Sequence, residues 1–367
     1  MNNYGDVISW MYSQLPFYQR QGSKAYKPNL GRMSDFVNYL GNPQNKIKAI
    51  SVVGTNGKYS TIQAMYAILK EAKINCNIYT SPHIKKINER FVFNNRELND
   101  DELSYLLEKV EKINDNQPIT FFEILTSAYF YKAAKYPNNI NLIEAGLFHR
   151  FDATNILKQN LASIVTSIGI DHLDWLPKNE QNINKIIFEK TSNLLKSNII
   201  IAKQSSRDIS ENIKKTIKKN KSNKILFNED YNFSLDENNF FYYEDQFGGM
   251  KLPNPNVNGQ FQLENISSAI ATLRSIEQLK ITDEQIKLGI TKIHSIARLQ
   301  EITDGKLKDL IKDNRLLIDG SHNPLGAKVL NNYLKSLDCD KHIIFGMMAN
   351  KNHKEYISCF KNIKSIT

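Results

Sequence analysis

The sequence predicts an α/β protein with a P-loop-type parallel sheet domain flanked by helices, followed by a smaller Rossmann-like α/β domain. An apolar run over residues 47–53 precedes a turn with two glycines and a lysine, and apolar residues at helical spacing follow that turn. Strand-like and helix-like segments then alternate along the chain, which is typical of a parallel sheet. A further strand, loop, helix and strand begin at residue 316, and we place the two domains at residues 1–296 and 297–367.

Short apolar strands and amphipathic helices alternate in the first half of the chain. The strand over 74–80 ends at Ser81-Pro82, because proline cannot donate a ladder hydrogen bond. The helix over 100–114 has an acidic first turn, and the helix over 120–136 ends before Pro137. In order, we expect helices at 6–20 and 33–40 around a loop at 25–30, a strand at 47–53, a helix after Ser60, a strand at 74–80, helices at 100–114 and 120–136, and strands at 141–146 and 161–168.

The second half continues the alternation with one all-β interruption. Aromatic and glycine residues over 224–252 predict a β-hairpin or small sheet, to which we assign no chemistry. Residues 295–298 read as the connection into the second domain. In order, we expect a strand at 198–202, a lysine-rich helix to about residue 221, helices at 258–279 and 283–293, a strand at 316–319, a helix at 327–337 and a strand at 343–346.

Composition and charge favour an enzyme of small acidic substrates. The 367 residues are 41% hydrophobic, and no apolar run reaches membrane-spanning length. The N-terminus lacks the layout of a signal peptide, so we expect a cytoplasmic protein. The net charge of +10 comes from lysines spread along the chain, with no basic module that would indicate nucleic-acid binding. Three widely spaced cysteines indicate neither disulfides nor a zinc site.

The turn after the first strand has the layout of a phosphate-binding loop. Two glycines allow backbone N–H groups to approach an anion, and the N-terminus of the next helix adds the positive end of its dipole. Lys58 would neutralise the outer phosphates, and a hydroxyl at Ser60 or Thr61 could help to hold Mg²⁺. The general pattern is incomplete, because Val52 stands at its first glycine and Tyr59 follows the lysine. An ordinary Asn-Gly turn therefore stays open as an alternative.

Polar residues recur at the carboxyl ends of several predicted strands, where open α/β sheets bind ligands. Besides the loop, these positions carry Ser81, Glu144 and His172. Each has a structural alternative: Glu144 could pair with Arg150, His172 could bond to its neighbour Asp171, and Ser81-Pro82 could be only a turn. Taken together with the loop they favour a Mg-ATP site, because Mg²⁺ prefers hard oxygen ligands and substrate phosphates.

The order and spacing of eight stretches resemble the folylpolyglutamate synthase/dihydrofolate synthase family of the Mur ligase superfamily. The stretches span nearly the whole chain. They are A-Y-K-P-N-L (25–30), V-V-G-T-N-G-K-Y-S-T (52–61), S-P-H-I-K-K-I-N-E-R-F (81–91), T-F-F-E-I-L-T (120–126), E-A-G-L-F-H-R-F-D-A-T-N (144–155), T-S-I-G-I-D-H-L-D-W-L (166–176), F-E-K-T (188–191) and L-I-D-G-S-H-N-P (317–324).

The resemblance implies an ATP-dependent ligase of folate biosynthesis. A pterin or folate carboxylate would attack the γ-phosphate of ATP, and the amine of L-glutamate would displace phosphate from the resulting acyl phosphate. Expected cofactors are ATP and one or two Mg²⁺ ions. We expect small-molecule substrates only, no nucleic acid, no membrane, and a monomer.

The resemblance also implies roles for individual residues. Lys190 matches a lysine that the family carbamylates; the alternative is a helix-surface lysine paired with Glu189. Asp319 and His322 match the face that the second domain brings to ATP and glutamate. The remaining matches are Gly54, Thr55, Asn56, Gly57, Lys58 and Ser60 (phosphate cradle), Ser60, Ser81, Glu144 and His172 (metal), Asn265 and Arg298 (ATP), and Phe122, Asp152 and Ala153 (pteridine pocket).

The chain departs from the family pattern at several positions. Tyr59 and the pair Phe148-His149 stand where the family has glycines, and Ala297 stands where a glycine is expected before Arg298. Relatives also run further at the C-terminus, so we expect the second domain to be incomplete. Two alternatives stay open: a non-catalytic nucleotide- or pterin-binding relative, and a cell-wall ligase of the same superfamily.

Overall fold

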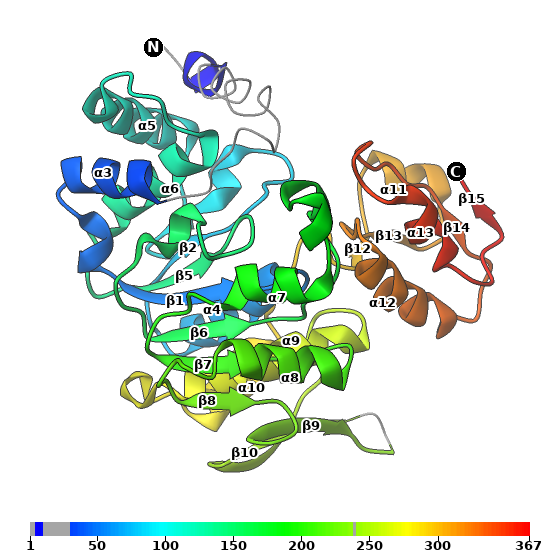
Figure 1. Cartoon of the computed structure of the whole chain (residues 1–367). Coiled ribbons are helices and arrows are strands. Elements are labelled where there is room, and N and C mark those ends of the chain that lie inside the picture. Colours follow the sequence, from blue (N-terminus) through cyan, green and yellow to red (C-terminus); the bar gives the residue numbers. More distant parts are fainter. Residues whose placement is uncertain (1–3, 10–29, 238–239) are drawn as a thin grey trace.

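The computed structural model describes residues 4–9, 30–237 and 240–367, and it is built around one large sheet (Figure 1). Residues 4–9 are helical, whereas the rest of the expected helix 6–20 and most of the expected loop 25–30 lie outside the described residues. Up to residue 300 the longer helices are α3 (Gly31–Tyr39), α4 (Lys58–Glu71), α5 (Asp100–Asn114), α6 (Phe121–Ala133), α7 (Ile183–Thr191), α8 (Arg207–Thr216), α9 (Gln260–Arg274) and α10 (Asp283–Ile290).

The large sheet has eight strands in the order β4-β3-β2-β5-β1-β6-β7-β8. The six strands from β2 to β8 in this order are parallel, and β3 and β4 add an antiparallel edge. This arrangement confirms the predicted class. The strands are β1 (Lys48–Val53), β2 (Cys76–Tyr79), β3 (Phe91–Phe93), β4 (Arg96–Glu97), β5 (Ile140–Glu144), β6 (Ala162–Val165), β7 (Asn198–Ile201) and β8 (Lys224–Leu226).

Helices cover both faces of the sheet because its central strands are apolar on both sides. In β1, Ile50 and Val52 belong to the core beneath α4, α9 and α10. The alternate residues face the other way: Ala49 packs in the core of α3, α5 and α6, and Val53 in the core of α7 and α8. All four side chains have no exposed surface, so both layers hold β1 in place.

Helices α5 and α6 each begin directly after a residue whose side chain caps the helix N-terminus. Asn99 accepts a hydrogen bond from the Glu102 amide before α5, and Thr120 accepts one from the Glu123 amide before α6. In each case the glutamate carboxylate in turn accepts a hydrogen bond from the capping residue's own amide. These reciprocal bonds satisfy amides that have no partner within the helix, which explains why both predicted starts match the structure.

The region expected as a hairpin over 224–252 divides between two sheets. β8 joins the large sheet, parallel to β7. The rest forms a separate antiparallel sheet of β9 (Tyr231–Leu235), β10 (Phe241–Asp245) and β11 (Gly248–Leu252). Tyr231, Phe241 and Tyr243 of this sheet pack into the core beneath α9. The prediction of local pairing throughout was therefore wrong for β8, whose partner lies earlier in the chain.

Residues 300–367, which we call the C-terminal unit, lie to one side of the large sheet (Figure 1). The predicted strand, loop, helix and strand occur in that order, but the strands do not pair with each other: β13 pairs antiparallel with β12, and β14 pairs with β15. The domain boundary at 297 stays a prediction. The elements are β12 (Gln300–Ile302), α11 (Lys306–Ile311), β13 (Leu316–Ile318), α12 (Pro324–Lys335), β14 (His342–Ile343), α13 (His353–Ser358) and β15 (Ser365–Ile366).

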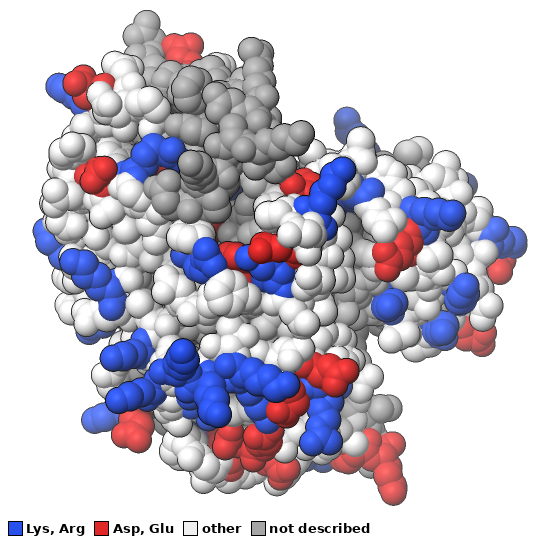
Figure 2. All heavy atoms as spheres, viewed as in Figure 1, with Lys and Arg blue, Asp and Glu red and all other residues white. Residues whose placement is uncertain are grey.

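Neither a membrane-spanning helix nor a buried basic segment is expected from the sequence. The described part of the chain contains no helix that is both long and apolar enough to cross a membrane. Lysine and arginine side chains gather in the lower part of the view in Figure 2, where Figure 1 places α8 and β8. In this lysine-rich segment Ile213 and Ile217 are buried, whereas Lys215, Lys218 and Lys219 are exposed, as expected of a solvated helix face.

Candidate active site

The turn between β1 and α4 requires both of its glycines. Gly54 has φ +149° and Gly57 has φ +90°. A Cβ atom at Gly54 would lie 1.9 Å from the Thr166 hydroxyl oxygen, and one at Gly57 would lie 2.4 Å from Asn265 Oδ1. The loop is therefore packed against β6 and α9 so closely that no side chain fits.

The first turn of α4 is the part of this loop suited to an anion. The Thr55 and Asn56 amides both donate to the Ser167 carbonyl, at 2.9 and 3.1 Å, which fixes the loop to the end of β6. The next amides, from Lys58 onward, begin α4, where the first N–H groups have no carbonyl partner within the helix. A phosphate placed there would receive those amides and the positive end of the helix dipole.

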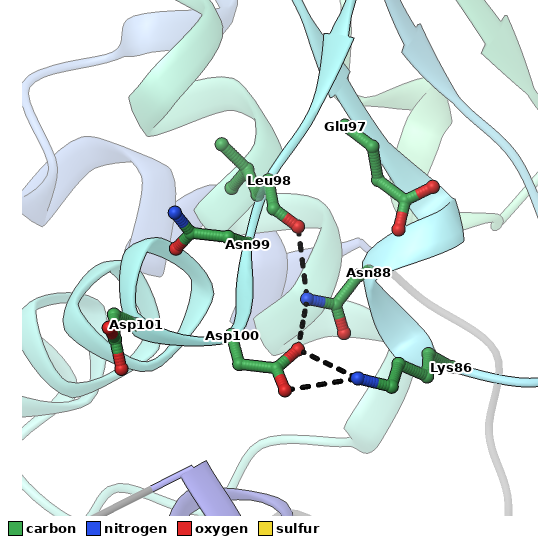
Figure 3. A pocket seen from close by; sticks show the side chains of 7 residues that line it. All are labelled: Lys86, Asn88, Glu97, Leu98, Asn99, Asp100 and Asp101. Atoms are coloured by element: carbon green, nitrogen blue, oxygen red, sulfur yellow. Dashed lines mark hydrogen bonds and ion pairs between the residues drawn. The ribbon is translucent and has the colours of Figure 1, made fainter.

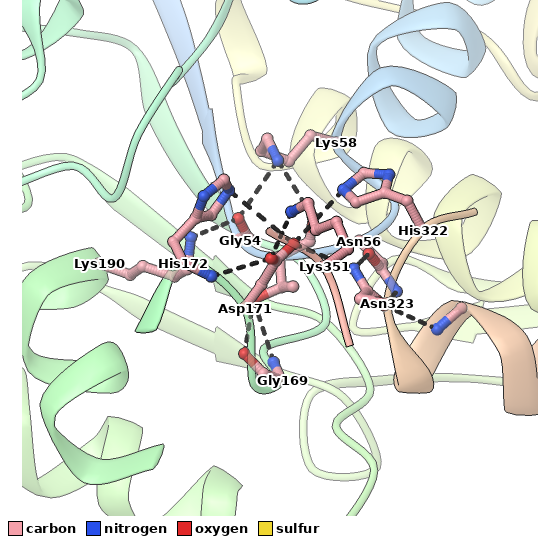
Figure 4. A network of polar contacts seen from close by, with 12 residues as sticks. Gly54, Asn56, Lys58, Gly169, Asp171, His172, Lys190, His322, Asn323 and Lys351 are labelled. Atoms are coloured by element: carbon pink, nitrogen blue, oxygen red, sulfur yellow. Dashed lines mark hydrogen bonds and ion pairs between the residues drawn. The ribbon is translucent and has the colours of Figure 1, made fainter. Parts of the chain in front are cut away.

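Two lysines converge on the phosphate loop. Lys58 Nζ donates to the carbonyls of Gly54 and Thr55, at 3.3 and 3.2 Å. Lys190 Nζ, from α7, donates to the same Gly54 carbonyl at 2.8 Å (Figure 4). Lys190 is only 3% exposed, which excludes the surface-lysine alternative. Burial, together with the charge of Lys58, lowers the pKa of Lys190 to about 7, so a large share of this amine is uncharged at neutral pH.

Glu144 stands at the carboxyl end of β5, beside the loop. It is 3% exposed, and its Oε2 accepts the Ser81 amide at 3.1 Å. Its Oε1 lies 3.8 Å from Lys58 Nζ. Burial raises the pKa of this carboxyl group, because one nearby lysine does not replace the lost hydration. The alternative pairing with Arg150 is wrong, since Arg150 pairs with Glu189 at 3.3 Å.

Two other predicted metal ligands, Ser60 and His172, carry neutral donor atoms. The Ser60 hydroxyl lies 3.3 Å from that of Ser295. Burial lowers the pKa of His172 to about 4, so its imidazole is neutral at pH 7. The described residues hold no group of three His, Cys, Asp or Glu able to bind a metal by themselves. The buried Glu144 carboxylate beside the loop fits Mg²⁺ carried on substrate phosphates, because this ion is usually held by one or two carboxylates.

The C-terminal unit closes one side of the loop through polar contacts (Figure 4). The Asn323 and Asn56 amide groups face each other, with N···O distances of 2.9 and 3.1 Å. His322 Nε2 and Lys351 Nζ both reach the Asp171 carboxylate, at 3.4 and 2.7 Å. Of these residues, the sequence did not single out Asp171, Asn323 or Lys351. The first two neighbour the predicted His172 and His322, whereas no signal in the sequence pointed to Lys351.

Arg298 lies in the connection between the two parts, and Asp319 follows β13 in the C-terminal unit. Asp319 accepts the amides of Leu299 and Ser321, both at 2.9 Å, so it fixes this connection in the structure. The Arg298 guanidinium lies 5.6 Å from the centre of the Tyr59 ring and donates to the Ala297 carbonyl at 2.8 Å. Tyr59 thus packs under Arg298, which accommodates its departure from the family pattern.

The Asn265 side chain lies at the loop, and the predicted pteridine residues lie on the far side of Glu144. A Cβ atom at Gly146 would come 2.7 Å from the Phe122 ring, which places that ring beside the end of β5. Asp152 is 5% exposed and accepts the amides of Gly146 and Leu147, at 3.1 and 2.9 Å, so it holds the turn after β5. Ala153 packs in the α6 core. A ligand role for Phe122, Asp152 and Ala153 stays a prediction.

The departure at Phe148-His149 places two rings beside Lys190 and His172. Phe148 has φ +57°, and its ring centre lies 5.5 Å from Lys190 Nζ and 6.3 Å from the His172 ring. His149 is 3% exposed, and its Nδ1 has no hydrogen-bond partner among the described residues. Burial lowers the pKa of His149 to about 3, so this side chain is a neutral packing residue.

A cavity of about 500 Å³ lies elsewhere, at the N-terminus of α5 (Figure 3). Lys86 pairs with Asp100 at 3.0 Å, and Asn88 donates to Asp100 and to the Leu98 carbonyl, both at 3.0 Å. Because these polar groups pair with one another and no predicted site residue lines the cavity, we assign it no function. Its lining is completed by Glu97, Asn99 and Asp101.

No family model matches the chain. Among curated proteins, it is 28% identical over 383 aligned positions to a Bacillus subtilis dihydrofolate synthase/folylpolyglutamate synthase, covering 99% of this chain and 83% of the relative. Its fold matches a Yersinia pestis bifunctional folylpolyglutamate synthase/dihydrofolate synthase complexed with AMPPNP and Mn ion, with TM-score 0.85, 23% identity, and coverage of 100% and 83%. A structure of such a bifunctional enzyme with Mn, AMPPNP and L-glutamate bound gives TM-score 0.84, 23% identity and the same coverage.

Proposed function

We propose that this chain, which belongs to the folylpolyglutamate synthase/dihydrofolate synthase family, is an ATP-dependent ligase that joins L-glutamate to dihydropteroate, to a reduced folate, or to both. The observation that carries the proposal is the convergence of Lys58, Lys190 and Glu144 at one phosphate loop. Phosphoryl transfer requires positioning and charge neutralisation more than covalent help, and these residues supply both.

In the first step, an oxygen of the substrate carboxylate attacks the γ-phosphorus of ATP, and the bond to the β-γ bridging oxygen breaks to release ADP. The α4 amides and Lys58 would hold the phosphates, with Lys58 exchanging its contacts to the loop carbonyls for phosphate oxygens. A bound Mg²⁺ would neutralise phosphate charge. Its proposed ligands are Ser60, Ser81, Glu144 and His172.

In the second step, the amine of L-glutamate attacks the acyl carbon, phosphate leaves, and the amine proton passes to water. Closure of the C-terminal unit over the loop would keep water from hydrolysing the acyl phosphate. The neighbouring roles are part of the proposal. Asn265, Arg298, Asp319 and His322 would contact the nucleotide or glutamate, and Phe122 with Asp152 and Ala153 would border the pteridine.

We also propose that Lys190 is carbamylated. An uncharged amine is required to attack carbon dioxide, and the lowered pKa of Lys190 supports its presence near neutral pH. The carbamate would replace a cation by a carboxylate-like group beside Lys58, which reverses the local charge.

A monomer in the cytoplasm completes the proposal. Both sides of the candidate site come from one chain, since Asn56 and Asn323 meet within it. A second copy is therefore not needed to assemble the site, and sedimentation of the purified protein would test this part.

The test is ADP release with Mg-ATP and a panel of acceptors: dihydropteroate, reduced folates and a UDP-sugar peptide precursor. We expect turnover that requires both L-glutamate and a pterin acid. Activity with the UDP-sugar precursor alone would place the enzyme in the cell-wall branch. ATP binding without turnover of any acceptor would contradict the ligase proposal.

A further inference from the structure

Five residues form a contact between the large sheet and the C-terminal unit, which we call the Asp171 cluster. They are Asp171 and His172 after β6, and His322, Asn323 and Lys351 from the C-terminal unit (Figure 4). Lys351 Nζ donates to Asp171 Oδ1 at 2.7 Å, and Asn323 Nδ2 donates to Oδ2 at 3.2 Å. The side chains of Asp171 and Lys351 are 8% and 16% exposed, so this pair is largely shielded from water.

Asn323 links the Asp171 cluster to the phosphate loop. Its Oδ1 accepts the Gly326 amide at 2.9 Å, which caps α12. The same amide group faces Asn56 of the loop. Because one side chain caps α12, faces the loop and contacts Asp171, the position of Asp171 is coupled through Asn323 to the position of the first turn of α12.

Residues 297–299, which connect the large sheet's domain to the C-terminal unit, include two residues with a strained backbone. Ala297 and Leu299 have φ of +51° and +48°, which cost energy for residues that carry a Cβ. Asp319 holds Leu299 through its amide, and the Gly320 amide donates to the Ala297 carbonyl at 2.8 Å. Asn258 also donates to the Leu299 carbonyl at 3.0 Å, so the connection is a hinge candidate held by several hydrogen bonds.

The C-terminal unit has little apolar burial of its own with which to hold its place. Its buried hydrophobic residues, among those the structure describes, are Ala327, Tyr356 and Phe360, which pack with one another. Its described polar contacts with the loops after β1 and β6 are concentrated in the Asp171 cluster and at Asn56. Polar contacts of this kind are directional, so they can specify one closed arrangement.

We propose that Lys351 is a positioning residue that, through Asp171, seats the first turn of α12 on the phosphate loop. Lys351 contributes a full positive charge to this cluster, whereas His172 and His322 are cationic only when protonated. Removing Lys351 leaves a shielded carboxylate without its closest cation, and such a loss is costly. The seating itself does not depend on the proposed function, but its effect on turnover rests on that function.

Hydrogen–deuterium exchange of the full chain without ligands tests the seating. In Lys351→Met we expect exchange at the amides of His172 and Gly326 to accelerate by roughly tenfold, because both amides donate to members of the Asp171 cluster. Lys351→Arg retains the charge and should restore slow exchange. Lys354→Met, which removes an exposed lysine of α13, is the matched control and should match the parent protein.

Turnover then separates positioning from direct ligand contact. We expect Lys351→Met to lower kcat by roughly tenfold with little change in the Kd of ATP measured by calorimetry, because the phosphate loop itself is intact. Unchanged exchange at His172 and Gly326 would overturn the proposal, whatever the activity. A raised KM for glutamate with unchanged exchange would instead make Lys351 a substrate-binding residue and would also overturn it. If no acceptor were turned over by the parent protein, the exchange result would still decide the question.

Discussion

The phosphate-loop edge of the large sheet and the C-terminal unit are held in place by different forces. The loop follows β1, a strand with residues buried on both faces of the sheet, such as Ile50 and Val53. The C-terminal unit has two-stranded sheets and a small core, and it meets the loop through polar side chains such as Asn323 and Lys351. The first region is therefore suited to hold phosphates in a constant geometry, and the second is suited to close and release.

This difference also separates the chemistry of the two regions. The loop edge carries groups with perturbed ionisation: burial raises the pKa of Glu144 and lowers that of Lys190. Charged groups on the C-terminal unit reach the site mainly by pairing with Asp171. Burial opposes the charged form of Asp171, but its pKa is lowered by the hydrogen bond from His322, by His172 in its protonated form, and by the hydrogen bond and charge of Lys351. Burial disfavours the charged forms of Glu144 and Lys190, and the packing around the large sheet keeps both side chains buried despite this free-energy cost.

We expect the largest loss of activity from a substitution in the phosphate loop. Lys58→Ala should lower kcat/KM for ATP by about 10³-fold, since it removes a lysine whose amine contacts the loop carbonyls. Steady-state ADP release measures this loss, and Lys70→Ala, which alters an exposed lysine of the same helix, is the control. Unchanged turnover in Lys58→Ala would refute the assignment of the loop.

Truncating one buried side chain in each core should affect the stability of the two parts differently. Ile50→Ala should lower the free energy of unfolding of the whole protein by about 2–5 kcal/mol, because a cavity forms in the central strand. Phe360→Ala, at an 8% exposed position, should leave the main urea transition in place and accelerate amide exchange only in the C-terminal unit. Equal losses in the main transition would show that the two parts unfold as one.

The smallest effect concerns pH. The pKa of His149 is lowered from 6.5 to about 3, so below pH 6.5 the unfolded state binds a proton that the folded state rejects. The free energy of unfolding should therefore be highest above pH 6.5 and fall as the pH drops toward 3. Between pH 7 and pH 5 this histidine alone should account for a loss of about 2 kcal/mol.

Urea titrations of the parent protein and of His149→Asn at the two pH values measure this term. The variant carries no titrating side chain at this position, so its loss of stability between pH 7 and pH 5 should be smaller by that amount. The same loss in both proteins would contradict the inference that His149 is buried in its neutral form.

Local features of the chain were predictable, and contacts between distant segments were not. The glycines and Lys58 of the loop, the capped start of α5, and the polar residues Glu144 and His172 at strand ends all follow from short-range patterns. Pairing of β8 with the large sheet did not, because its short apolar run also fits a local hairpin. The burial of Lys190 against Gly54 joins residues 136 positions apart, for which no short pattern exists.

The sequence alone was enough to predict the α/β class, much of the order of strands and helices, and a phosphate loop followed by polar strand ends, because periodicity and turn chemistry act over a few residues. It did not predict α7, β3 or β4, and it did not show how the pieces meet. Lys351 and Asp171 lie 180 positions apart, yet their contact places the C-terminal unit against the loop. Such contacts depend on the packing of the whole chain, since a charged side chain gives no local sign of the partner that it will find.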